Sequence, residues 1–132
     1  MGDKQPLEST RSAQLAFVAV DHARLSYAYL NSGDVDAYTS LFEKDTVLRR
    51  PEVTVYGRDE LERYHQRRIG LHRYSVATVI ASGSGEHVVV VGSATGPGSG
   101  EQVGFVDVFT VSSRGLFTSQ QVFHFTPRGA PR

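Results

Sequence analysis

Apolar residues recur at steps of three and four positions early in the chain, which is typical of one face of an amphipathic helix. The pattern predicts a long helix over about residues 12–31, with a stripe formed by Leu15, Val18, Ala19, His22, Leu25, Ser26 and Tyr29. The sequence NSGD follows, and Gly33 is the expected C-terminal cap. Asp34 is expected to cap a second helix that ends at about residue 43, and a third helix is expected over about residues 59–69.

Apolar and β-branched residues dominate the second half of the chain, in runs that are typical of β-strands. Four such runs cover about residues 72–82, 86–96, 101–112 and 115–127, and short glycine-containing turn sequences separate them. We expect these runs to form an antiparallel meander of long strands. Two shorter strand-like runs flank Pro51, which has no N–H to donate and therefore belongs at a bulge, bend or sheet edge.

Helices first and antiparallel strands afterwards indicate an α+β fold. Three helices cannot cover both faces of such a sheet, so we expect a cone-shaped, curved antiparallel sheet wrapped around the long helix, with a cavity on its concave side. The length of 132 residues fits one domain. We expect this domain at 12–127, with a flexible N-terminal tail at 1–11 and a C-terminal tail at 128–132.

One carboxylate interrupts the strand-like segment GFVDVFTV. Asp107 shares a face with Val103, Phe105, Phe109 and Val111, because side chains alternate between the two faces of a strand. Moving an ionised carboxylate out of water is costly, so Asp107 must be paired, hydrogen-bonded, protonated or open to a wet cavity. This residue is therefore the first candidate for a functional site.

The charge balance argues against nucleic acid and anionic membranes as partners, because 14 basic side chains face 14 acidic ones and no basic stripe follows an expected helix. The lack of cysteine excludes disulfides and thiolate chemistry. No secretion signal is seen, and the longest apolar runs are too short to span a bilayer, so we expect a soluble, cytoplasmic protein. The histidines lack metal-binding spacings such as H-E-x-x-H, so we predict no metal and no cofactor.

Two segments carry a resemblance to a known family. NSGDVDAYTSLFEKDTVLRRPEVTVYGRDELERYH and FVDVFTVSSRGLFTSQQVFH resemble motifs of the ketosteroid isomerase and SnoaL-like branch of the NTF2-like superfamily, and the resemblance covers about residues 19–127. It implies a cystatin-like α+β cone that encloses a deep, mostly apolar pocket. Members include steroid isomerases, polyketide cyclases, dehydratases, epoxide hydrolases and proteins that only bind ligands or act as scaffolds, so the fold does not settle the reaction.

The resemblance places the family's oxyanion-hole aspartate, which is kept neutral by its apolar site, at Asp107. The base of the isomerases precedes the strand proline, and this chain has Arg50 there, which cannot accept a proton. The steroid isomerase reaction is therefore not expected. The oxyanion tyrosine of the first helix aligns with Ser26, while Tyr27 and Tyr29 lie on neighbouring faces, and His124 replaces an aromatic residue that lines the pocket.

These positions predict catalytic roles for Asp107, His124 and Arg50. Arg50 is expected to keep Asp107 ionised by lowering its pKa, and to stabilise a developing enolate. His124 is the preferred general acid/base, because imidazole titrates near neutral pH. The resulting hypothesis is acid/base catalysis next to a carbonyl (cyclisation, isomerisation or dehydration) on a hydrophobic, polyketide-like specialised metabolite. The expected substrate-binding residues are Ser26, His22, Tyr29, Tyr64, Phe105, Phe109 and Val122.

Other interpretations remain open at this point. Asp107 and Arg50 are also compatible with a buried structural ion pair, and a one-residue shift in register would turn His124 out of the cone. The protein would then be a non-catalytic ligand-binding or scaffold protein, or a module that binds a different protein. A basic cluster of Arg67, Arg68 and Arg73 is either a solvated surface or a guide for an anionic substrate.

The outward face of the sheet suggests the assembly. Four apolar residues are expected there, Val106, Val108, Phe117 and Phe123, which is more apolar surface than a monomer ordinarily exposes. We expect a homodimer packed through the sheet.

Overall fold

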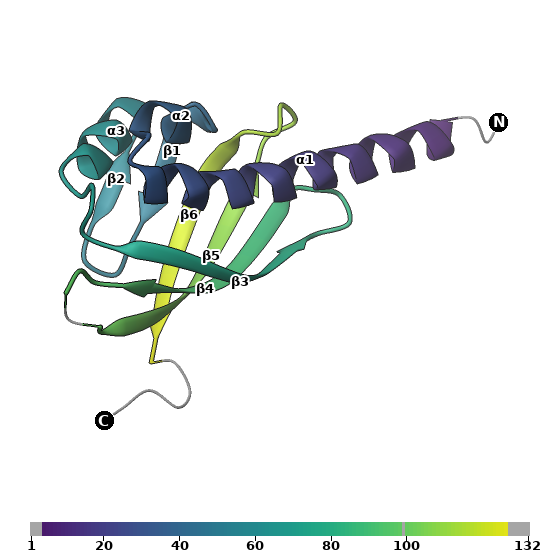
Figure 1. Ribbon diagram of the computed structural model, residues 1–132. Helices are drawn as coiled ribbons and strands as arrows, with labels where there is room; N and C mark the ends of the chain where they lie inside the picture. The colour runs from purple at the N-terminus through teal and green to yellow at the C-terminus, as the bar shows by residue number, and fades with distance from the viewer. Residues whose placement is uncertain (1–3, 99, 127–132) are drawn as a thin grey trace.

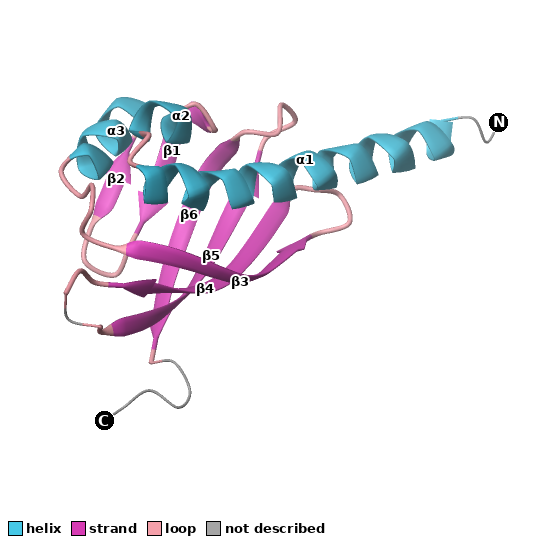
Figure 2. Ribbon diagram, viewed as in Figure 1, coloured by secondary structure: helices cyan, strands magenta, loops and turns pink. Residues whose placement is uncertain are grey.

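The structure is a computed structural model that describes residues 4–98 and 100–126. It contains a long helix, two short helices and a six-stranded sheet (Figures 1 and 2). The helices are α1 (Lys4–Ser32), α2 (Val35–Thr39) and α3 (Arg58–Gln66). The strands are β1 (Phe42–Arg49), β2 (Thr54–Tyr56), β3 (Arg73–Ala81), β4 (His87–Thr95), β5 (Gln102–Val111) and β6 (Phe117–Phe125).

The expected α+β architecture is confirmed. Strands β3 to β6 form the predicted antiparallel meander, and the full order across the sheet is β2-β1-β6-β5-β4-β3. The sheet curves beneath α1, while α2 and α3 lie together at one end (Figure 1). The position of β1 was not predicted: it pairs in parallel with β6, so the first strand of the chain joins the last.

The helix ends differ in detail from the expected ones. Helix α1 begins at Lys4 rather than at about residue 12, and its C-terminus at Gly33 is as predicted, with φ of 76° and a hydrogen bond of 2.9 Å from the Asp34 N–H to the Tyr29 carbonyl. Asp34 caps α2 as expected, because its side chain accepts from the Ala37 N–H at 3.1 Å.

Two helices are shorter than expected. Helix α2 ends at Thr39 instead of residue 43, since the chain from Phe42 onwards pairs as β1, and α3 ends at Gln66 instead of residue 69. Strand pairing therefore takes precedence over the apolar spacing that suggested a longer α2. The prediction for residues 128–132 lies outside the described residues.

A β-bulge changes which side chains of β6 face the core. Strict alternation would place Phe117 on the outward face with Phe123, but Phe117 is fully buried while Phe123 is 50% exposed. The register between β5 and β6 shifts between Thr110 and Val111, so β6 contains one extra residue at this point. The expectation that Phe117 belongs to the outward apolar face is therefore wrong.

The core lies between α1 and the concave face of the sheet. It includes Ala19, Ala23 and Tyr27 from α1, together with alternate residues of the strands, such as Val88, Val90, Phe105, Phe109 and Val122. None of the helices in the described part of the chain is both long and apolar enough to cross a membrane. The buried polar residues include Asp107, a carboxylate that is costly to bury without hydrogen-bond partners.

Candidate active site

Asp107 lies in the middle of β5, on the face of the sheet that α1 covers. Its neighbours across the sheet are Val90 of β4 and Val122 of β6, and only 4% of Asp107 is exposed. The period of two along β5 therefore places the carboxylate where the sequence predicted, among the apolar residues of the core.

Two side chains donate hydrogen bonds to one oxygen of this carboxylate. The Tyr27 hydroxyl donates to Asp107 Oδ2 at 2.5 Å, and the Gln120 Nε2 amide donates to the same oxygen at 3.1 Å. Gln120 is held in turn by Tyr38, whose hydroxyl donates to Gln120 Oε1 at 3.3 Å. Asp107 Oδ1 has no hydrogen-bond partner among the described residues. In the neutral acid the proton accordingly resides on Oδ1, because Oδ2 already accepts two hydrogen bonds.

Burial raises the pKa of Asp107 to about 6, although the hydrogen bonds from Tyr27 and Gln120 and the charge of Arg50 act in the opposite direction. Arg50 does lower the pKa of Asp107, as expected, but burial has the larger effect, so the net shift is upward and not downward. The reason is partly geometric: Arg50 forms its ion pair with Glu52, with 2.8 Å between Nε and Oε1. Asp107 thus exchanges its proton close to neutral pH.

A cavity of about 150 Å³ opens beside Asp107. Its wall is formed by Arg50, Arg68, His72, Tyr74, Ala94, Val103, Phe105, Asp107, Val122 and His124. Along β5 the exposed fraction falls from 43% at Val103 to 3% at Phe105, so Val103 marks the open end and Asp107 the closed end. Asp107 is the only acidic residue among those that line the cavity.

Arg50 and His124 meet at the wall of this cavity. Arg50 is fixed at the β1–β2 turn by backbone hydrogen bonds with Val53 of 2.8 and 3.3 Å, and its Nη2 lies 3.5 Å from His124 Nε2. A guanidinium only donates, so His124 Nε2 is the acceptor and the imidazole is neutral with its proton on Nδ1. Burial, and then the charge of Arg50, lower the pKa of His124, which agrees with this state.

The structure brings together some of the residues that the sequence suggested and separates others. Asp107, His124, Arg50, Phe105 and Val122 all line the cavity. The remaining five do not line it: Ser26, His22, Tyr29, Tyr64 and Phe109.

Three of these five have contacts that explain their positions. The Ser26 hydroxyl donates to the Ala23 carbonyl one helical turn earlier, at 2.7 Å, and His22 Nδ1 donates to the Gly115 carbonyl at 2.6 Å. Phe109 packs against Phe117 with 4.3 Å between ring centroids. Tyr64 lies next to the site, where its ring carries the Arg68 guanidinium at 5.1 Å, and Tyr29 packs against the core.

Tyr27 is the main residue that the sequence comparison misplaced. The family's helix tyrosine aligned with Ser26, yet Tyr27 reaches Asp107, and one residue along a helix changes the direction of a side chain by about 100°. Gln120 was also missed. Its signal was present in the sequence, because it is a polar residue two positions before Val122 on the inward face of β6.

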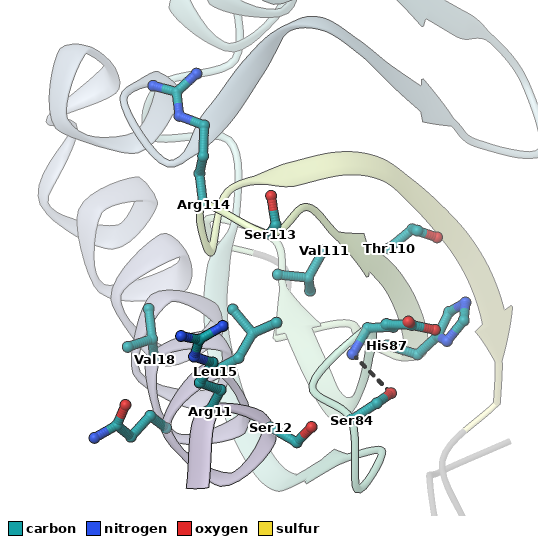
Figure 3. Close-up of a pocket in the computed structure, with 12 residues that line it drawn as sticks. Arg11, Ser12, Leu15, Val18, Ser84, His87, Thr110, Val111, Ser113 and Arg114 are labelled. Carbon is teal, nitrogen blue, oxygen red and sulfur yellow. Dashed lines mark hydrogen bonds between the residues drawn. The ribbon is translucent and has the colours of Figure 1, made fainter. Parts of the chain in front are cut away.

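A second and larger hollow lies elsewhere, between the N-terminal half of α1 and two strand-connecting turns (Figure 3). It is open to solvent, has a volume of about 820 Å³, and is lined by residues that include Arg11, Leu15, Val18, Ser84, His87 and Arg114. Arg114 is engaged with Glu43 at 3.2 Å. Within the part of the chain that the structure describes, this hollow contains no buried polar atom that lacks a partner. The smaller cavity, with the unpartnered Oδ1 of Asp107, is therefore the candidate site.

Among residues 4–98 and 100–126, no three His, Cys, Asp or Glu side chains lie together in a group that could hold a metal ion.

Solved structures share this fold at low sequence identity. The epoxide hydrolase/cyclase-like enzyme SalBIII, which has a role in pyran ring formation in the polyether salinomycin, matches with 22% identity over 81% of this chain and 90% of its own, at a TM-score of 0.70. A steroid delta-isomerase from Pseudomonas aeruginosa matches with 17% identity over 84% and 81%, at a TM-score of 0.68. An NTF2-like protein of unknown function from Cytophaga hutchinsonii matches with 14% identity over 81% and 89%, at a TM-score of 0.70.

The amino-acid sequence matches one family model. No curated protein matches the chain. The family model of the SnoaL-like domain matches residues 23–120, from the middle of α1 to Gln120 in β6. This span contains Tyr27, Arg50, Asp107 and Gln120, and hence most of the cavity wall and the hydrogen bonds around the buried acid. The chain therefore belongs to the SnoaL-like domain family of NTF2-like proteins.

Proposed function

We propose that this protein is a cofactor-independent enzyme that moves a proton next to a carbonyl group of a small hydrophobic molecule. The observation that carries the proposal is the unpartnered Oδ1 of Asp107, on a buried acid with a pKa of about 6 at the closed end of a cavity. Such a group is well matched to general acid/base catalysis, because both of its protonation states are populated near neutral pH.

The chemistry follows from the hydrogen bonds. Ionised Asp107 takes a proton from the carbon next to the carbonyl through Oδ1, the C–H bond breaks, and its electron pair moves onto the carbonyl oxygen. Tyr27 and Gln120 remain on Oδ2 throughout, and Arg50 supplies a donor for the enolate oxygen. The proton held by Asp107 is then returned in one of three ways. The enolate attacks a second carbonyl and the new alkoxide takes the proton, another carbon takes the proton, or a hydroxyl group leaves and takes the proton to form water. These outcomes are cyclisation, isomerisation and dehydration.

Asp107 is a better base than His124 in this arrangement. The Nε2 of His124 faces Arg50, and the pKa of His124 is lowered by burial and by the Arg50 charge. We assign His124 to positioning Arg50. This assignment reverses the preference that the sequence alone suggested, since the sequence did not reveal which atom of His124 faces the guanidinium.

The substrate class is supported by the cavity wall and by the relatives. Phe105, Val122, Val103 and Ala94 form an apolar wall beside the polar groups, and SalBIII has a role in forming a ring of a polyether. We propose a polyketide-like specialised metabolite with a carbonyl group, and a role in the biosynthesis of such a compound.

The exchange of α-protons of cyclohexanone for deuterium, followed by NMR in D₂O, tests the reaction. The rate above the buffer background is expected to be half-maximal near pH 6 and to reach a plateau above it, because the base must be deprotonated and burial raises the pKa of Asp107 to about 6. One pH unit below the midpoint, the rate is expected to be about tenfold lower than the plateau rate, because only about one tenth of Asp107 is then ionised. If cyclohexanone binds and no exchange above background occurs at any pH, the non-catalytic ligand-binding alternative replaces this proposal.

A homodimer through the outward face of the sheet is part of the proposal. Helix α1 covers one face, and the other carries an apolar group formed by Ile80, Val89, Val91, Val106, Val108 and Phe123, with Ile80 59% and Phe123 50% exposed. We expect a dimer by light scattering at micromolar concentration. Phe123→Lys is expected to weaken it about tenfold or more, whereas Phe17→Lys on the exposed surface of α1 is expected to leave it unchanged. A monomeric wild-type protein at micromolar concentration would contradict the dimer.

A further inference from the structure

The wall of the active-site cavity carries an excess of basic groups. Arg50, Arg68, His72 and His124 all line it, and the only acid in the wall is Asp107 at the closed end. These four residues come from three different segments: the β1–β2 turn, the connection between α3 and β3, and β6. Their convergence at one cavity is therefore produced by the tertiary structure.

The charge of Arg68 is not neutralised by an acid. The described part of the chain has two salt bridges, Arg50–Glu52 and Arg114–Glu43, and neither involves Arg68. The Tyr64 ring holds the Arg68 guanidinium at 5.1 Å, which orients the planar group without using its donors. Arg68 thus presents free N–H groups beside the cavity.

This positive charge contributes to lowering the pKa of two neighbouring imidazoles, those of His65 and His72. Burial, and then the charges of Arg50 and Arg68, lower the pKa of the buried His65 to about 3. Burial and the charges of Arg68 and Arg50 also lower the pKa of His72. Both arginines therefore act on several groups around the cavity, and an anion in the opening would relieve this repulsion.

The size of the cavity limits what fits between these groups and Asp107. His124 is the neighbour of Phe105 across the sheet. Phe105 lies two residues before Asp107 along β5, so His124 is displaced from Asp107 by about 7 Å in the direction of the strand. The cavity volume of about 150 Å³ is comparable to that of a cavity of about 150 Å³ that holds benzene. One six-membered ring fills this space, and a four-ring molecule would extend out through the opening.

We propose that the ligand of this site is a one-ring or similarly small molecule with a carboxylate, which binds Arg68 near the opening while the ring reaches toward Asp107 and Arg50. The inference rests on the proposed function for the identity of the reacting carbon, and it adds the charge and the size of the substrate. It also decides between the two interpretations of the basic cluster: Arg68 recognises an anion, whereas Arg67 is exposed and does not line the cavity.

The test compares two probes that differ in charge and share one shape, 3-oxocyclohexanecarboxylate and 3-oxocyclohexanecarboxamide. Dissociation constants are measured by calorimetry at low salt, and the imidazole C–H signals of His72 and His124 are followed by NMR over a pH range. We expect the carboxylate to bind about tenfold tighter or more than the amide, as a charge-assisted contact in a partly buried site allows. We also expect bound carboxylate to raise the pKa of both histidines.

Variants separate recognition of the charge from general effects on the cavity. Arg68→Gln is expected to remove most of the tenfold preference and to leave amide binding within about twofold, while Arg67→Gln is expected to retain the full preference. Equal binding of the two probes, binding of neither, or equal weakening of both by Arg68→Gln would each overturn the inference.

The two proposals fail in different experiments. Cyclohexanone has no charge, so its Asp107-dependent proton exchange can persist when the carboxylate shows no preference, and then only the inference about the substrate is wrong. In the converse case the carboxylate binds through Arg68 and no α-proton of any probe exchanges, which contradicts the proposed reaction and leaves the anion site in place.

Discussion

Asp107→Asn is expected to lower the rate of cyclohexanone proton exchange by about 10²–10⁴-fold, the usual contribution of a positioned general base. The amide of asparagine is neutral and does not take the proton, while its shape is close to that of the carboxylate. Exchange is followed by NMR above pH 7, where wild-type Asp107 is largely ionised because its pKa is about 6.

The control for this variant is Asp21→Asn on the exposed surface of α1, which is expected to retain the wild-type rate. Thermal unfolding of both variants verifies that they are folded. An Asp107→Asn protein that is folded, binds cyclohexanone and exchanges its protons at the wild-type rate would show that Asp107 is not the base.

Phe109→Ala is expected to destabilise the protein by about 3–5 kcal/mol, which is the usual cost of removing a buried phenylalanine ring. Phe109 is 1% exposed, and its ring packs against Phe117 with centroids 4.3 Å apart and against Tyr27 with centroids 6.3 Å apart. The free energy of unfolding is measured by urea denaturation. This loss is large compared with the total stability of most small domains.

Two further variants show whether Phe109 acts in the core or on the ligand. Phe17 is 78% exposed, so Phe17→Ala is expected to change the unfolding free energy by less than about 0.5 kcal/mol. Phe109→Leu keeps an apolar side chain and is expected to leave the affinity for 3-oxocyclohexanecarboxylate unchanged. A loss of affinity in Phe109→Leu with unchanged stability would restore Phe109 to the substrate-binding residues that the sequence suggested.

The sequence predicted much of the fold because local residue patterns specify most of its helices, strands and turns. The four long strands alternate with a period of two or are bounded by glycine turns, Gly33 and Asp34 mark the junction of α1 and α2, and the motifs around Pro51 and Asp107 resemble one family. The ends of the helices were predicted less accurately, since α1 begins earlier and α2 ends earlier than the sequence pattern suggested. Those limits depend on which strand the flanking residues pair with.

The site was predicted in part. Asp107, Arg50 and His124 line one cavity, and the inward direction of Asp107 follows from alternation along β5 alone. The sequence did not reveal the partners of Asp107. Tyr27 lies 80 positions and Gln120 13 positions away along the chain, and each reaches Oδ2 through contacts that no local pattern specifies.

The protonation of the site also depended on the tertiary structure. Placing Arg50 near Asp107 suggested a lowered pKa, whereas burial raises the pKa of Asp107 to about 6 and Glu52 pairs with Arg50. Desolvation depends on everything that surrounds a group, and the sequence contains no direct record of it.

Taken by itself, the sequence determined the fold class, the family and the presence of an acid on the inner face of β5, because these follow from periodicity, turn residues and motifs. The tertiary structure decided which oxygen of Asp107 is free, that the β6 bulge buries Phe117, and that Arg68 and Arg50 line the same cavity. These features result from contacts between distant segments, and their geometry is set only when the sheet closes around α1.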